Sequence, residues 1–88
     1  MNRRERILEI LEKNLNPKFI SVVDFSNEHS GHSGSKPEGE THFRVTITHP
    51  SEISLVSFHR RIYNLLHLEF CEGLHALEIL PNEETERV

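Results

Sequence analysis

Histidines are the residues of this sequence best suited to chemistry. The chain has seven histidines in 88 residues; His29, His32 and His42 fall within residues 26–43, and His75 follows further along. Histidine is a common metal ligand and is the side chain that ordinarily titrates near neutral pH. The sequence therefore directs attention to metal binding by these four histidines.

The segment that carries the first three of these histidines has the composition of a loop. Residues 26–43 read SNEHSGHSGSKPEGETHF, with three glycines and one proline. Such a segment bends freely, and a loop of this length in a small domain indicates a function. Gly31–Gly34 match the GxxG clamp of nucleic-acid-binding KH domains. That clamp lies between two helices, whereas here it falls between two expected strands and contains no Lys or Arg, so we do not assign it that role.

Composition limits the classes of function. Ten Lys and Arg against fourteen Asp and Glu give a net charge of −4, which opposes the phosphate contacts that supply most nucleic-acid affinity. Cys71 is the single cysteine, so neither an internal disulfide nor an all-cysteine metal site can form within one chain. No apolar run approaches the roughly 20 residues that span a bilayer, and charged residues follow Met1 at once. We expect one soluble, monomeric, non-enzymatic domain over residues 1–88, placed in the cytoplasm, with an organelle matrix as the alternative.

The first half of the chain predicts a helix followed by two strands. Asn2 and Glu5 have capping-box spacing, and apolar residues then recur at helical intervals, which predicts a helix over 2–15. A β-branched and aromatic run predicts a strand over about 18–25. From Thr41 onward, apolar and polar residues alternate, which predicts a second, half-buried strand antiparallel to the first.

The second half predicts a long helix and a third strand. Residues 54–71 repeat apolar side chains every three to four positions, and Gly73 stands where a left-handed helix cap would be. Leu74–Leu80 has the character of a strand, and the acidic tail 81–88 is expected to be flexible. The predicted fold is a single α+β domain in the order α-β-β-α-β, with a three-stranded mixed sheet and helices packed on one face.

This topology brings the histidines together. The second helix and its flanking strands are each roughly 23–27 Å long, so the helix returns the chain to where the second strand began. The third strand should then run parallel to the second through a right-handed crossover. His42 and His75 therefore begin neighbouring strands at the end of the sheet that also bears the loop with His29 and His32.

Several short motifs in one order resemble the BolA-like family over nearly the whole chain. The matching residues are Asp24, Ser26, His29, Gly31-His32, Glu40-Thr41-His42-Phe43, His59-Arg60 with Ile62 and Tyr63, and His75-Ala76-Leu77. The chain departs from the family pattern at Phe58, where Arg is usual. The resemblance implies a fold similar to class II KH domains and a partnership with a monothiol glutaredoxin.

The resemblance also implies a shared [2Fe-2S] cluster. In such a heterodimer the glutaredoxin cysteine and a glutathione thiolate supply two ligands, and the BolA-like protein supplies two more. Here these would be His75 and a loop histidine, for which His29 matches best and His32 is the alternative; His42 is a lesser candidate and is more simply a structural hydrogen-bonding residue. Histidine replaces cysteine on one iron in Rieske centres, so this ligation is chemically reasonable. No cofactor is expected in the isolated protein.

Two other interpretations remain open from the sequence. His29, His32, His42 and His75 could together supply the three or four ligands of a Zn²⁺ site. A DNA-binding transcriptional regulator, a role also attributed to BolA-like proteins, would use the long helix and its preceding turn, with His59, Arg60 and Arg61 on the contact surface.

Overall fold

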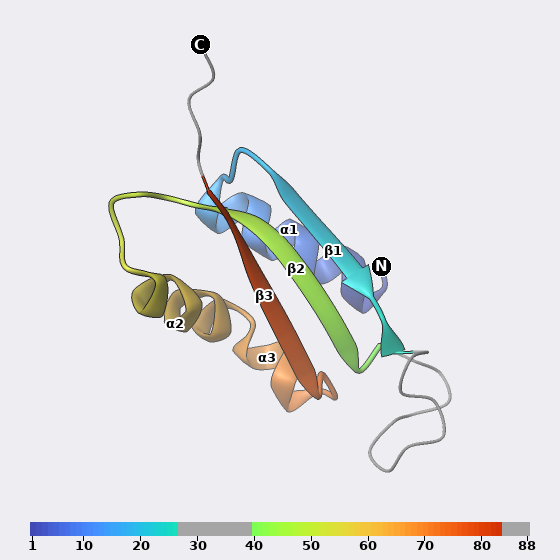
Figure 1. The fold of residues 1–88 in the computed structure, drawn as a ribbon. Coiled ribbons are helices and arrows are strands. Elements are labelled where there is room, and N and C mark those ends of the chain that lie inside the picture. The colour runs from blue at the N-terminus through green and yellow to red at the C-terminus, as the bar shows by residue number, and fades with distance from the viewer. Residues whose placement is uncertain (27–39, 84–88) are drawn as a thin grey trace.

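The structure is a computed structural model that describes residues 1–26 and 40–83, and it has the predicted α+β architecture. A three-stranded sheet in the order β1-β2-β3 is covered by helices on one face (Figure 1). Strands β1 and β2 are antiparallel, whereas β2 and β3 are parallel. The elements in chain order are α1 (Arg3–Leu15), β1 (Ile20–Asp24), β2 (His42–His49), α2 (Leu55–Leu65), α3 (His67–Cys71) and β3 (Ala76–Glu83).

Helix α1 begins as the sequence predicts. The Asn2 side chain accepts a hydrogen bond from the Glu5 backbone amide (2.8 Å), and the Glu5 carboxylate accepts one from the Asn2 amide (3.0 Å). This reciprocal pair is a complete capping box, which satisfies two amides that a helix start leaves unpaired. The helix ends at Asn16, whose left-handed backbone (φ 46°) precedes Pro17.

The core lies between the sheet and the helices. Val45 at the centre of β2 is opposite Val22 on β1 and Ile79 on β3. Because side chains alternate between the faces of a strand, this register puts one set of apolar residues beneath the helices and leaves the other face open. The buried apolar cluster comprises Ile7, Leu11, Val22, Phe43, Val45, Ile47, Phe58, Ile62, Leu66, Leu74, Leu77 and Ile79.

The predicted helix over residues 54–71 is two helices, so that expectation was wrong in part. The chain leaves helical geometry at Leu66 (φ −98°, ψ 15°), and α3 begins at the next residue. The buried positions of α2 are Phe58 and Ile62, followed by its C-cap Leu66, while Leu55 and Val56 are exposed. Phe58 therefore serves the core, and the four-residue spacing of these three positions follows one face of the helix.

Strand boundaries differ by a few residues from those predicted. Strand β1 is shorter than residues 18–25, and β3 runs from Ala76 to Glu83 rather than over 74–80. Three residues assigned to the flexible tail thus belong to the sheet, because Pro81, Asn82 and Glu83 pair with the last three positions of β2. The rest of the predicted tail, 84–88, lies outside the described residues.

The turn after α3 is the predicted glycine cap. Gly73 has φ 123°, which favours glycine, and the Leu74 amide donates to the Glu69 carbonyl at 2.9 Å. This i to i+5 bond is the longer of the two that close a Schellman cap. It directs the chain from α3 straight into β3.

A buried charged cluster joins α3 to the start of α1. Arg3 Nε donates to one carboxylate oxygen of Glu69 (2.9 Å), and Arg6 Nε donates to the other (2.8 Å). Arg3 and Glu69 are both buried, while Arg6 lies at the rim. The Arg6 hydrogen bond, with a further contribution from Arg3, holds the pKa of Glu69 below its ordinary value of 4.5 although burial acts in the opposite direction.

We expect Glu69→Gln to destabilise the protein at neutral pH by about 3 kcal/mol, because it removes the charge that compensates buried Arg3. Glu69 has a lower pKa in the folded state, so its contribution is present above about pH 4.5 and is lost as pH falls through the folded-state value. Urea unfolding of wild type and variant across pH 3–7 should therefore show a stability gap that narrows in acid. Glu9→Gln, at an exposed position on α1, is the control, and a pH-independent gap would contradict this account.

Candidate functional site

His75 lies immediately before β3 with an exposed side chain. Its backbone amide donates to the Thr41 carbonyl at 2.8 Å, and the next amide, of Ala76, donates to the same oxygen at 3.0 Å. These two bonds fix the backbone of His75 beside the start of β2. The imidazole is thus carried on a rigid strand start while its side chain faces solvent.

His42 begins β2 next to His75, as the topology predicts. The centroids of the two imidazole rings are 5.3 Å apart, with the planes tilted by 50°. In contrast to His75, His42 is only 8% exposed. Its Nδ1 shares a 2.8 Å hydrogen bond with Thr41 Oγ1, and its ring meets Phe25 edge-on at 6.0 Å. His42 therefore packs beside His75 as a supported, mostly buried ring.

Ser26 joins the two ends of the histidine-bearing loop. Its hydroxyl oxygen accepts from the backbone amides of Thr41 and His42, both at 3.0 Å, and donates to Asp24 Oδ1 at 2.6 Å. The Ser26 amide donates to the same Asp24 oxygen at 2.9 Å. One hydroxyl thus fastens the residue at which the loop leaves β1 to the two residues at which the chain enters β2.

Arg3, at the start of α1, holds Glu40, where the loop returns to the sheet. Its backbone amide donates to Glu40 Oε1 at 2.8 Å, and its guanidinium donates to the Glu40 carbonyl. Glu40 has φ 64°, a left-handed backbone that costs a non-glycine residue free energy and persists only where surrounding contacts impose it. Arg3 supplies such contacts, so α1 takes part in holding the loop base next to His75.

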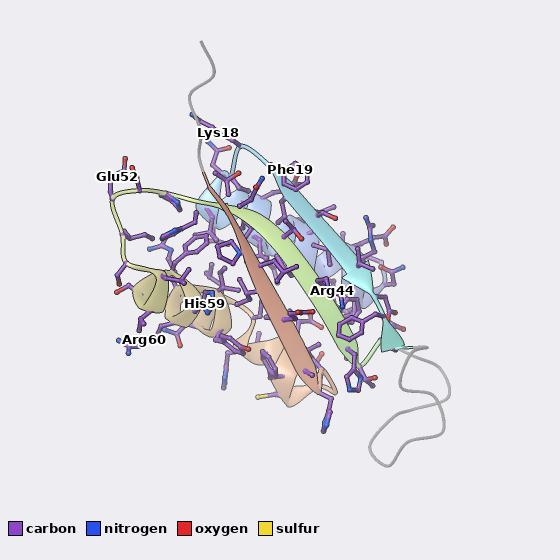
Figure 2. All side chains as sticks on the ribbon, in the orientation of Figure 1. Lys18, Phe19, Arg44, Glu52, His59 and Arg60 are labelled. Atoms are coloured by element: carbon purple, nitrogen blue, oxygen red, sulfur yellow. The ribbon has the colours of Figure 1, made fainter. Side chains whose placement is uncertain are left out.

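The predicted site residues separate into two groups. His42 and His75 share the loop end of the sheet, whereas His59, Arg60 and Arg61 lie on α2; Figure 2 shows His59 and Arg60 on that helix, away from β2. His29 and His32 lie outside the described residues. Residues 1–26 and 40–83 contain no group of three or more His, Cys, Asp or Glu side chains able to hold a metal ion. The four-histidine zinc site thus stays a prediction.

Two further histidines and the cysteine lie away from the His42–His75 pair. His59 is half-buried, and its Nε2 is a buried atom without a hydrogen-bond partner in the described structure. His49 is half-buried, and its ring centroid lies 5.1 Å from that of Phe58 with the two planes tilted by 36°. Cys71 is exposed, with its sulfur 3.7 Å from His67 Nε2.

Sequence reasoning missed the residues that hold the site in place. Asp24, Ser26 and Glu40 were recognised as matching motif positions without a structural role, and Arg3 and Glu69 were not singled out. Asp24-x-Ser26 has the spacing of an Asx turn, in which an aspartate side chain accepts from the amide two residues on. That signal was available in the sequence. The pairing of Arg3 with Glu69, across 66 positions, had no local signal.

Comparison with known proteins gives consistent matches. The family model described as BolA-like protein matches residues 11–86. Protein BOLA1, chloroplastic, of Arabidopsis thaliana is 40% identical over 97% of this chain, which spans about half (56%) of that protein. The DNA-binding transcriptional regulator BolA of Escherichia coli is 36% identical over 86% of this chain and 70% of its own length. The solved BolA domain of SufE1 from Arabidopsis thaliana is 44% identical, with a TM-score of 0.80 over 94% of this chain and 93% of that one.

We expect Ser26→Ala to destabilise the protein by about 2 kcal/mol, because it leaves two buried backbone amides, of Thr41 and His42, without their acceptor. Thermal unfolding measures the loss. Ser57→Ala, at an exposed position on α2, should change stability by less than about 0.5 kcal/mol. Equal effects of the two substitutions would show that Ser26 does not anchor the loop base.

Proposed function

The chain belongs to the BolA-like protein family, and on that premise we propose that it is an adaptor that binds a monothiol glutaredoxin and shares a [2Fe-2S] cluster with it. The observation that most supports this proposal is the position of His75. Its exposed imidazole stands on a fixed backbone, beside the points where the histidine-bearing loop leaves β1 and returns to β2.

The metal-ligating residues of this chain fit a [2Fe-2S] cluster shared with a partner better than one held by this chain alone. The chain has one cysteine, whereas [2Fe-2S] centres are held by thiolates, with histidines in place of two of them at Rieske sites. The thiolates would therefore come from the glutaredoxin and from glutathione, and His75 with His29 or His32 would complete the set. When bound, the cluster supplies electron-transfer or cluster-transfer chemistry; the isolated chain is proposed to be a monomer without it.

The role of the chain in this proposal is to present nitrogen ligands in a fixed place. The Thr41 carbonyl holds the His75 backbone, and the His42 ring packs beside the His75 ring, which limits where that imidazole can move. Ser26 and Arg3 hold both ends of the loop close to it. Groups placed beyond the metal ligands in this way tune and orient those ligands. Binding requires neutral imidazoles, so cluster occupancy should fall in acid.

The test is cluster assembly with a monothiol glutaredoxin, glutathione, iron and sulfide, followed by absorption and circular dichroism. We expect a spectrum distinct from that of the glutaredoxin homodimer, lost or altered in His75→Ala and in one of His29→Ala and His32→Ala, because each of those changes removes a nitrogen ligand.

His67→Ala, which removes an exposed histidine on α3, is the matched control and should leave the spectrum unchanged. A wild-type spectrum identical to that of the glutaredoxin homodimer would refute the shared cluster. An unchanged mixed spectrum in His75→Ala would refute His75 as a ligand.

A second candidate function is DNA binding by α2. Arg60 and Arg61 are adjacent exposed cations on this helix, and the Escherichia coli relative is named a DNA-binding transcriptional regulator. The net charge of −4 argues against it. The exposure of Arg60 and Arg61 supports this candidate, since phosphate contacts are made by cations at the surface.

For DNA binding, we expect Arg60→Gln and Arg61→Gln each to reduce the slope of log affinity against log salt by about 1, since each would remove one phosphate contact. Fluorescence anisotropy with a labelled duplex over 50–200 mM salt measures the slope. Lys13→Gln, at an exposed position near the end of α1, is the control. Absence of salt-sensitive binding in the wild type would eliminate this candidate.

No helix within residues 1–26 and 40–83 is long and apolar enough to cross a membrane. The cytoplasm remains our proposal for the location, and the chloroplastic designation of the Arabidopsis relative supports an organelle as the alternative.

A further inference from the structure

A cavity of about 310 Å³ opens at the end of the sheet opposite the histidines. It is enclosed by the end of α1 and the turn that follows, the end of β2, the connection to α2, and α2 itself. Its lining residues are Asn14, Leu15, Asn16, Pro17, Lys18, Thr48, Pro50, Ile53, Phe58 and Arg61. Because β2 has eight residues, the cavity lies roughly 23 Å from His42 at the other end of that strand.

The walls of this cavity are fixed by hydrogen bonds and packing. The Phe19 amide donates to Thr48 Oγ1 at 2.8 Å, and the Thr48 amide donates to the Phe19 carbonyl at 3.0 Å, which locks the turn after α1 to β2. On the other side, His49 Nε2 bonds to the Ile53 carbonyl at 2.7 Å and the His49 ring stacks on Phe58. The hollow is therefore preformed rather than a gap between mobile segments, as is usual for small-molecule sites.

The lining combines an apolar floor with positive charge. Leu15, Pro17, Pro50, Ile53 and Phe58 supply the apolar surface. Lys18 and Arg61 are the charged residues that the described part of the chain, 1–26 and 40–83, contributes to the lining. In a chain of net charge −4, two cations that line one concave surface favour the approach of an anion.

Arg61 is the side chain best placed to orient a bound group. It is exposed at the mouth, and it also lines the adjoining hollow formed with Ile53, Ser57, Arg60 and Asn64. The guanidinium makes planar, paired hydrogen bonds to carboxylates. The volume is near the lower limit of ligand pockets, so it suits one ring or short branched chain rather than a large cofactor.

We propose that this cavity binds a small carboxylate with a compact apolar body, the apolar part against Ile53 and Phe58 and the carboxylate on Arg61. The site is independent of the proposed cluster function, because it lies at the other end of the sheet and uses neither His42 nor His75. It gives the domain a second binding end, which a metabolite with this chemistry would occupy.

The test is a titration of the ¹⁵N-labelled protein with 3-phenylpropionate, followed by two-dimensional NMR of the backbone amides. We expect saturable shifts confined to the amides around the cavity, those of Lys18, Thr48, Ile53, Phe58 and Arg61. The neutral analogue 3-phenyl-1-propanol should bind about tenfold more weakly, because it lacks the charge-assisted hydrogen bonds to the guanidinium.

Arg61→Gln should weaken binding of 3-phenylpropionate about tenfold, while Arg60→Gln, an adjacent cation outside the cavity lining, should leave it within twofold. Arg61 is exposed, so its substitution should preserve the fold, which the amide spectrum of the variant checks directly. Absence of saturable shifts up to 10 mM probe, on the order of the weakest affinities worth assigning, would overturn the proposal. Equal affinity for acid and alcohol, or equal loss in the two variants, would also overturn it.

Discussion

The buried guanidinium of Arg3 is the constraint on which the histidine end of the molecule depends. A charge removed from water is tolerated only where its donors are satisfied and its charge is balanced. Arg3 meets both requirements through the Glu69 carboxylate and the backbone carbonyls of Glu40 and Glu72. These acceptors come from α3, from the turn after α3 and from the returning end of the loop. Satisfying one side chain therefore fixes three segments relative to the start of α1.

Hydrogen bonds from helix side chains also cover part of both edges of the sheet. In a three-stranded sheet β1 and β3 are both edge strands, with backbone groups open to pairing with another chain. Arg4 Nε donates to the Val22 carbonyl on β1 at 2.7 Å, and the Tyr63 hydroxyl donates to the Leu77 carbonyl on β3 at 2.9 Å. Each edge thus has a carbonyl occupied by a helix side chain, which ties the helices to the sheet and reduces the surface available for edge pairing.

Local signals in the sequence predicted the helices and strands. The contacts that hold the candidate site in place join residues far apart in the sequence, so they could not be predicted. The capping box of α1, the alternation of β2 and the Gly73 cap depend on neighbouring residues, so they could be identified from the sequence. The meeting of His42 and His75 also followed, because helix and strand lengths fix the topology. The break at Leu66 could not be predicted, since no glycine or proline marks it within residues 54–71. Nor could the role of Arg3, because its partners are 37 to 69 positions away.

His42 and His75 illustrate why proximity alone does not identify a ligand. Their rings are neighbours, yet His42 is buried, bonded through Nδ1 to Thr41 and packed on Phe25, whereas His75 is exposed. Under the proposed function the metal would approach from solvent, so exposed His75 would be the ligand and buried His42 its support. This division assigns the two histidines different tasks at one strand end. The hydroxyls of Thr41 and Ser26 contribute to this arrangement, because the first bonds the His42 ring and the second accepts from the His42 backbone amide, so both hold the buried ring in place.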